Sequence, residues 1–221
     1  MRADDVKRSI LAAAACAAAA SMTACGGGDD SRPAVTVGDL PAGVHMVSTG
    51  NADQPTVGRY YASADGKRLL VLEDDHDAAS LLLRRPGGGS PWVAVPEPQA
   101  DLDVQFLRSQ AVAAATPALP ALAGRYVVRL SDGSAADFRI GTDGRLTAGT
   151  LSRCQLSGTL AAGALPGTLS ATLAARDCPG LPASATGVLV QDPSDAPAAL
   201  RLLADDGSRL VDLRGYGEPG A

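Results

Sequence analysis

The sequence is poor in aromatic residues. Only 3% of its 221 residues are aromatic, with one tryptophan, four tyrosines and two phenylalanines. Binding sites for sugars, bases and protein hot spots depend heavily on tryptophan, tyrosine and arginine. The core must therefore be built from aliphatic side chains, and few rings remain for a ligand site.

Long runs of basic residues are also missing. No run exceeds two residues, as at Lys67–Arg68 and Arg84–Arg85, and the net charge is −5. A protein that binds a phosphate backbone needs clustered lysine and arginine. The sequence therefore predicts no nucleic-acid partner.

Signatures of catalysis are scarce. The chain has only two histidines to act as a base, no serine stands in a GxSxG turn, and the glycines at 87–89 precede Ser-Pro-Trp instead of the lysine of a phosphate-binding loop. His45, in the alternating run GVHMV, is expected to be a surface or hydrogen-bonded residue. We predict no enzyme activity and no cofactor.

The densest polar cluster is Glu73–Asp77, which reads EDDHD. Four carboxylates and an imidazole are suitable ligands for a divalent cation. The cluster lies between two apolar runs, however, and lacks the glycine and spacing of a calcium loop, so we predict a solvated hairpin loop and no metal site.

Trp92 is the single tryptophan and is flanked by prolines and short apolar residues. We expect it in a core or at the end of a barrel. The alternative is an exposed anchor for a protein partner, because tryptophan often serves as a hot spot.

The features that are present begin at the N-terminus. Basic residues at positions 2, 7 and 8 precede the apolar run Ile10–Ala20. This run has the length of a signal-peptide core and is shorter than the roughly 20 residues of a membrane-spanning helix. Residues 1–24 are therefore predicted to be a signal peptide and not part of the fold.

The end of this segment, Met22–Cys25 (MTAC), resembles the lipobox of bacterial lipoproteins, with methionine in place of the commoner leucine. The resemblance implies that Cys25 carries a thioether-linked lipid and becomes the first mature residue, so that the membrane is a partner through this lipid. Two alternatives remain. Cys16 leaves too short an apolar core, and Ala18–Ala20 suits an ordinary signal peptidase and a soluble periplasmic protein.

Residues 25–33 are rich in glycine and aspartate and predict a flexible tether. Two or three acyl chains hold a protein durably on a bilayer. Gly26 is not the aspartate that resembles an inner-membrane retention signal, which favours the outer membrane, with the protein facing the periplasm or the cell surface.

Two cysteines remain once Cys16 and Cys25 are accounted for. In an oxidising compartment Cys154 and Cys178 are expected to form a disulfide, which would stabilise the fold by roughly 3 kcal/mol in the chain-entropy description. A metal or redox site would need a CxxC spacing or nearby histidines, and neither is present.

The second half of the chain alternates apolar and polar residues with a period of two, which predicts strands. Asp-Gly and Pro-Gly turns separate the runs, so neighbouring strands are expected to be antiparallel. The predicted strands are 125–130, 137–140, 145–147, 154–160, 168–173, 186–190, 199–203 and 209–216. We predict an all-β fold in which this antiparallel meander closes into an eight-stranded barrel, with a two-sheet sandwich as the alternative.

A smaller, related β module is predicted upstream. The run 58–73 echoes 124–140, since each has Gly-Arg-Tyr, a strand, Asp-Gly and a second strand. Further strands are predicted at 80–85, 91–96 and 102–107. We divide the mature chain into an N-terminal module (34–108), an Ala/Pro-rich linker (109–123) and the barrel module (124–217). One continuous sheet system is the alternative.

The segment 116–216 resembles the C-terminal half of uncharacterised lipoproteins of Gram-negative bacteria. The shared pattern is Ala-Gly-x-Tyr at 123–126, a hairpin, a glycine-rich strand, Cys154 before Ser-Gly-Thr, then Cys178 and Thr-Gly-Val at 186–188. The resemblance implies a secreted β fold with a disulfide and brings no established activity.

These observations together predict a membrane-anchored, non-catalytic lipoprotein of the cell envelope that binds an envelope protein or has a structural role. The alternative is a carrier that encloses a small apolar ligand in its barrel. Inward-facing leucines at 156, 160, 169 and 173 would fill the barrel, whereas Gly158 and Ala171 would leave space.

Overall fold

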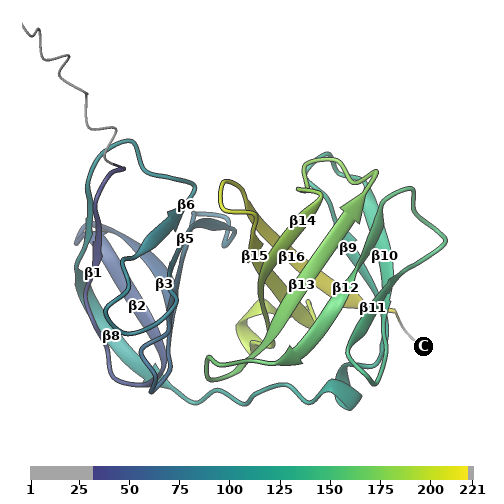
Figure 1. The fold of residues 1–221 in the computed structure, drawn as a ribbon, viewed down its shortest axis with the longest axis horizontal. Coiled ribbons are helices and arrows are strands. Elements are labelled where there is room, and N and C mark those ends of the chain that lie inside the picture. The colour runs from purple at the N-terminus through teal and green to yellow at the C-terminus, as the bar shows by residue number, and fades with distance from the viewer. Residues whose placement is uncertain (1–31, 219–221) are drawn as a thin grey trace, which may run out of the picture. The chain divides into compact units, whose positions relative to one another are not determined.

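The computed structural model describes residues 32–218, and these form an all-β fold with two short 3-10 helices. The predicted signal peptide (1–24), the lipidation site Cys25 and the predicted tether up to residue 31 lie outside the described residues. The smaller, N-terminal part of the described chain consists of an open sheet and a strand pair (Figure 1).

The open sheet has six antiparallel strands in the order β6-β5-β4-β3-β2-β8. β1 (Val35–Val37) and β7 (Leu102–Val104) pair in parallel as a separate two-stranded sheet. The strands of the six-stranded sheet are β2 (Gly43–Asn51), β3 (Gln54–Ala62), β4 (Arg68–Glu73), β5 (Ala79–Arg85), β6 (Val93–Val95) and β8 (Phe106–Val112).

The C-terminal strands close into a barrel, drawn in green to yellow in Figure 1. Its strands are β9 (Gly124–Arg129), β10 (Ala135–Ile140), β11 (Arg145–Ala148), β12 (Gln155–Ala162), β13 (Thr168–Arg176), β14 (Ser184–Val190), β15 (Leu200–Asp205) and β16 (Leu210–Gly217). Each strand pairs with the next, and β16 returns to β9 through the pair Gly215 and Val128. The predicted eight-stranded meander barrel is confirmed, and the sandwich alternative is wrong.

The two sequence runs that echo each other form hairpins with the same turn. Gly66, between β3 and β4, and Gly133, between β9 and β10, have φ angles of +88° and +82°. Residues with a Cβ rarely adopt such angles. In each turn the preceding aspartate accepts a backbone hydrogen bond, from Lys67 to Asp65 at 3.2 Å and from Ser134 to Asp132 at 2.9 Å. The repeat therefore specifies a hairpin, which is used once in an open sheet and once in a closed barrel.

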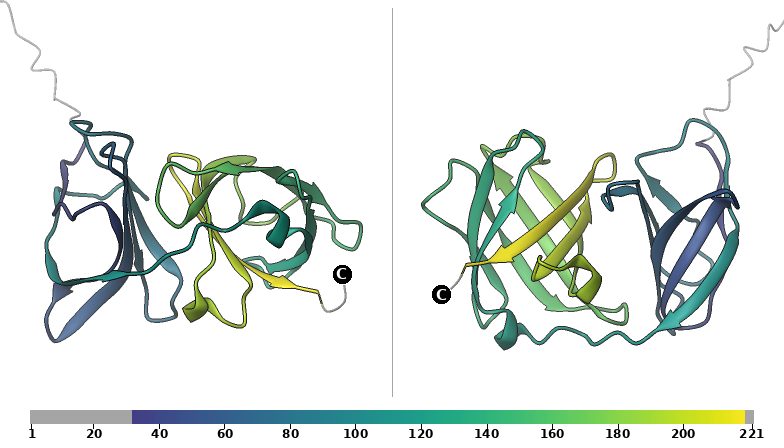
Figure 2. Two further views of the ribbon diagram at one scale, coloured as in Figure 1. Left: turned by 90° about the horizontal axis from the view of Figure 1, so that it is seen from below. Right: turned by 180° about the vertical axis from the view of Figure 1, so that it is seen from behind.

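The barrel interior is filled by its own side chains. The inward-facing leucines predicted at 156, 160, 169 and 173 are all buried in one hydrophobic cluster. Ala171 lies in the same cluster, and a Cβ on Gly158 would lie 2.0 Å from the carbonyl oxygen of Thr172. The short helix η1 (Leu119–Leu122) lies at one end of the barrel (Figure 2, left) and adds the fully buried Leu122 to the cluster. Side chains thus occupy the space that a lumen ligand would need.

The six-stranded sheet buries apolar side chains on both faces. Tyr60 and Leu70 face a cluster that includes β1 and β7 residues, whereas their neighbours Tyr61 and Leu69 pack with Val188 of the barrel and other β14 and β15 residues. Adjacent strand residues point to opposite faces of a sheet. The sheet is therefore a middle layer, with β1 and β7 on one face and barrel strands on the other.

Two predicted boundaries need correction. The segment 102–107 is not one strand, because β7 ends at Val104, β8 begins at Phe106, and the two belong to different sheets. β8 then continues to Val112, so the first four residues of the predicted linker (109–123) are strand. The alternation at 109–112 is weak because β8 is an edge strand with exposed residues on both sides of the sheet.

The predicted disulfide is confirmed. Cys154 and Cys178 are bonded, and they lie just outside the paired residues Gln155 of β12 and Arg176 of β13. The bond closes the open end of the β12–β13 hairpin and constrains a loop of 24 residues. In the chain-entropy description such a loop contributes about 3 kcal/mol.

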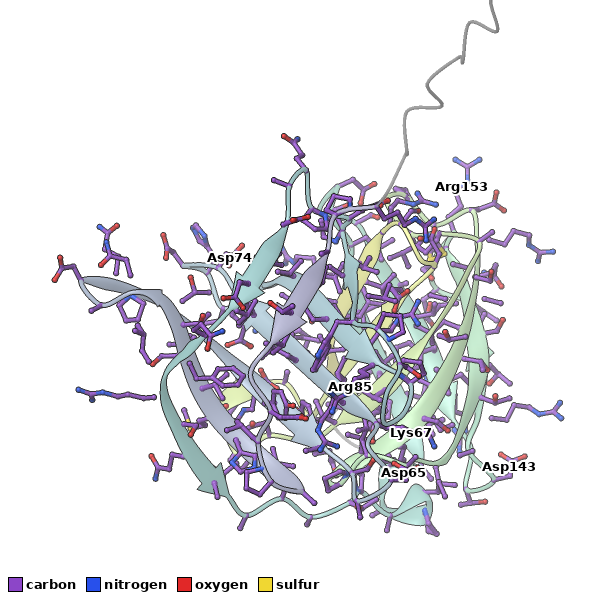
Figure 3. The ribbon with its side chains drawn as sticks, turned by 60° about the vertical axis from the view of Figure 1, so that its left-hand side comes forward. Asp65, Lys67, Asp74, Arg85, Asp143 and Arg153 are labelled. Carbon is purple, nitrogen blue, oxygen red and sulfur yellow. A yellow bond between two sulfur atoms is a disulfide. The ribbon has the colours of Figure 1, made fainter. Side chains whose placement is uncertain are left out.

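Acid is expected to destabilise the fold through its turn aspartates. Hydrogen bonds from backbone and side-chain donors in the turns lower the pKa of Asp65, Asp74, Asp132 and Asp206; Figure 3 shows the first beside Lys67 and the second in its loop. A carboxyl with a lowered folded-state pKa contributes stability above its unfolded pKa, near 3.9, and loses it as the pH falls through the folded value. The urea midpoint should therefore hold between about pH 6 and 5 and fall below about pH 4.

The matched control replaces all four aspartates with asparagine, which accepts the same turn hydrogen bonds and does not titrate. Its urea midpoint should fall less between pH 5 and 3 than that of the unmodified chain. An equal fall in both proteins would contradict the assignment to these turns.

Candidate functional site

A cleft of about 400 Å³ lies between the six-stranded sheet and the barrel. One wall comes from β2, β3, β4 and the β4–β5 loop. The other comes from β14, β15, β16 and the segment around the short helix η2 (Pro193–Asp195). This volume is within the range of small-ligand and peptide pockets in proteins.

Arg201 of β15 is the most buried charged group of the cleft, with 5% of its side chain exposed. It forms two parallel hydrogen bonds to Asp212 of β16, at 2.8 and 2.7 Å. It also donates to Glu73 at the end of β4 and to the carbonyl oxygen of Asp77. Burial opposes the charge, but the bonds to Asp212 and Glu73 outweigh it and raise the pKa of Arg201. The guanidinium therefore joins a barrel strand to a strand of the sheet as a permanent cation.

Two further arginines complete what we call the charged cluster. Arg59 of β3 pairs with Asp192 and donates to the hydroxyl of Ser194 at 3.0 Å. Arg214 of β16 donates to the carbonyl oxygen of Asp77 and lies 3.5 Å from Asp195. The cluster thus contains the three arginines 59, 201 and 214 and the five carboxylates Glu73, Asp77, Asp192, Asp195 and Asp212. It carries two more negative than positive charges.

The partial burial of the cluster is visible in its titration. Burial raises the pKa of the Asp195 carboxyl, against the opposing effect of Arg201 and Arg214. Burial also raises the pKa of Tyr61, on the floor of the cleft, to about 12. The region is therefore a low-dielectric one in which charge interactions are stronger than in water.

Exposed apolar side chains gather at the same cleft. Met46 of β2, Val57 of β3 and Tyr216 of β16 are 50%, 47% and 41% exposed, and all three line it. Buried Tyr61, Val71, Val190 and Leu203 form the apolar part of its floor. The cleft therefore offers apolar contact on both walls beside a net negative cluster.

A second cavity, of about 810 Å³, shares several lining residues with the first, namely Arg59, Tyr61, Val190 and Asp192. Its remaining lining comes largely from the connecting segment 112–118 and from residues next to η2. The Arg59–Asp192 ion pair thus contributes to both cavities.

The sequence-predicted polar residues have structural roles. The loop 73–77 is a hairpin turn in which Asp74 accepts hydrogen bonds from the backbone of His76 and Ala78. Among residues 32–218 no group of three histidine, cysteine or acidic side chains is arranged to hold a metal ion. His45 is buried, and its Nε2 lies 2.9 Å from the carbonyl oxygen of Pro41.

Trp92 packs in the N-terminal module and not at the end of the barrel. Its ring contacts Tyr60, with centroids 6.2 Å apart, and the guanidinium of Arg85 lies 5.2 Å from the ring centroid. Figure 3 shows Arg85 within this module. The ring is partly buried against the module's hydrophobic cluster, so its role as a core residue accounts for its position.

Sequence reasoning missed the charged cluster. The run at 199–203 was read only as a barrel strand, although it places Arg201 and Leu203 on the outer face. An outer face that is apolar on β14 and β15, with Val188, Val190 and Leu203, is the available signal that another layer covers these strands.

Among the described residues no helix is long and apolar enough to cross a membrane. Comparison with protein-family models, with curated proteins and with solved structures found no match for this chain.

Proposed function

We propose that this chain is a non-catalytic lipoprotein of the Gram-negative cell envelope, anchored to the outer membrane through lipid on Cys25, and that it binds a protein partner at the cleft. The lipobox-like segment Met22–Cys25 and the signal-peptide pattern before it support the anchor. The observation that carries the binding role is the gathering of Met46, Val57 and Tyr216 at one cleft.

Exposed apolar groups that cluster around a concavity are typical of interaction sites. The alternative, a carrier of an apolar ligand in the barrel lumen, requires a cavity where Leu122, Leu156 and Leu189 are fully buried against one another's cluster. We therefore favour binding on the outside of the barrel.

The anchor is tested by metabolic labelling with an alkyne fatty acid, comparing the unmodified chain with Cys25→Ala. We expect label and membrane association for the first and neither for the second, because acyl chains supply the membrane affinity. An unlabelled, soluble unmodified chain would contradict the anchor.

The binding role is tested in cells that naturally produce the protein, by placing a photo-crosslinking amino acid at position 57. The matched control carries it at Leu151, which is 74% exposed and does not line the cleft. We expect one discrete adduct from position 57 and none from position 151. Equal adducts, or none at position 57, would overturn the proposal.

A further inference from the structure

We infer that the cleft receives an extended peptide segment in which an apolar side chain lies next to lysine or arginine. The inference rests on the proposed binding role and names the chemistry of the partner. It follows from charge complementarity together with the placement of apolar side chains on the two walls.

The arginines of the cluster are committed to partners within the chain. Arg59 is paired with Asp192, Arg201 with Asp212 and Glu73, and Arg214 with Asp195. An anionic ligand would have to replace these carboxylates and leave them without a partner in a partly buried site, which is costly. The cleft therefore disfavours carboxylate or phosphate ligands.

A cation meets the opposite situation. The cluster has two negative charges in excess, and the loop residue Asp77 lines the cleft with an exposed side chain. A lysine or arginine at the mouth of the cleft would approach these charges without breaking an existing ion pair. The raised pKa of Asp195, caused first by burial, agrees with a site in which additional positive charge is stabilising.

The apolar side chains determine where the neighbouring residue of the peptide would lie. Met46 and Val57 come from the sheet and Tyr216 from the barrel, so a side chain inserted between them contacts both walls. Methionine adapts to the shape of a guest, and tyrosine offers a ring face to a cation. The segment that fits is short and extended, with one apolar anchor between basic residues.

The test uses the full mature chain, lipidated and held in detergent micelles, and a fluorescein-labelled pentapeptide with the composition Gly-Lys-Leu-Arg-Gly. Two comparison peptides replace both basic residues with glutamate or the leucine with serine. Fluorescence anisotropy, corrected for peptide binding to empty micelles, should show the first peptide binding at least about tenfold more tightly than either comparison peptide. Binding should weaken as salt rises, because salt screens exposed charges.

Variants of the protein locate the site. Asp77→Asn removes one charge and keeps a side chain that tolerates the φ of +58° at this position; Val57→Ser removes an apolar contact. We expect each to weaken binding of the basic peptide by about three- to fivefold. The matched controls are Asp143→Asn, in a barrel turn visible in Figure 3, and Leu151→Ser. Neither should change binding.

The inference is wrong if the glutamate peptide binds as well as the basic one, or if the cleft variants bind like their controls. It is also wrong if no peptide binds while position 57 still crosslinks a partner in cells; in that case the proposed binding role stands and only the partner chemistry fails. Loss of both signals would overturn both.

Discussion

Arg201→Ala is expected to lower the free energy of unfolding by about 3–5 kcal/mol, because it removes one member of a buried ionic group and leaves the others uncompensated. Asp212 and Glu73 would each lose a guanidinium partner, and both are largely buried, with 11% and 17% of their side chains exposed. The measurement is urea unfolding at pH 7, followed by circular dichroism.

Arg209→Ala is the matched control. Arg209 pairs with Asp206 on the surface, with 58% of its side chain exposed, and exposed pairs contribute about 0–1 kcal/mol. The double variant Arg201→Ala with Glu73→Ala should cost less than the sum of its single changes, because the second substitution removes an orphaned carboxylate. An Arg201→Ala cost no larger than that of the control would show that the buried cluster is not a structural link between sheet and barrel.

The barrel was predictable from the sequence because its rules are local. Period-two alternation identified the strands, and Asp-Gly turns such as the one at Gly133 identified antiparallel neighbours. Counting eight such strands favoured a closed barrel, since closure removes unpaired edges. The disulfide followed from the number of cysteines left for the predicted compartment, and the structure places the two sulfurs across one hairpin.

The cleft was not predictable because it depends on how distant segments pack. Glu73 and Arg201 are 128 residues apart, and nothing in either local run shows that they meet. The sequence presented residues 73–77 as a solvated loop, which is correct for Asp74, yet Glu73 belongs to a buried ion pair. The edge strand β8 was missed for a related reason: its residues from Leu107 to Ala111 are exposed on both faces, so they show no alternation.

Phe138→Ala is expected to lower the free energy of unfolding by about 3–5 kcal/mol, the usual cost of removing a buried phenylalanine ring. Phe138 of β10 is 1% exposed, and its ring stacks on Tyr126 of β9 with centroids 5.8 Å apart. Tyr126 in turn donates a hydrogen bond to the carbonyl oxygen of Leu122 at 2.9 Å, which ties the η1 helix to the barrel end. Urea unfolding at pH 7 measures the change, and Leu151→Ala, at an exposed site, should stay within about 0.5 kcal/mol of the unmodified chain.

The same variant distinguishes a filled barrel from a carrier. If side chains fill the lumen, the alanine leaves an apolar cavity that excludes water and binds a small aromatic molecule. Saturating benzene should therefore raise the melting temperature of Phe138→Ala and leave that of the unmodified chain unchanged, because a ligand stabilises only a state that it binds. Stabilisation of the unmodified chain by benzene would mean that the lumen already holds space for a guest. In that case the carrier function would account for the barrel better than partner binding at the cleft.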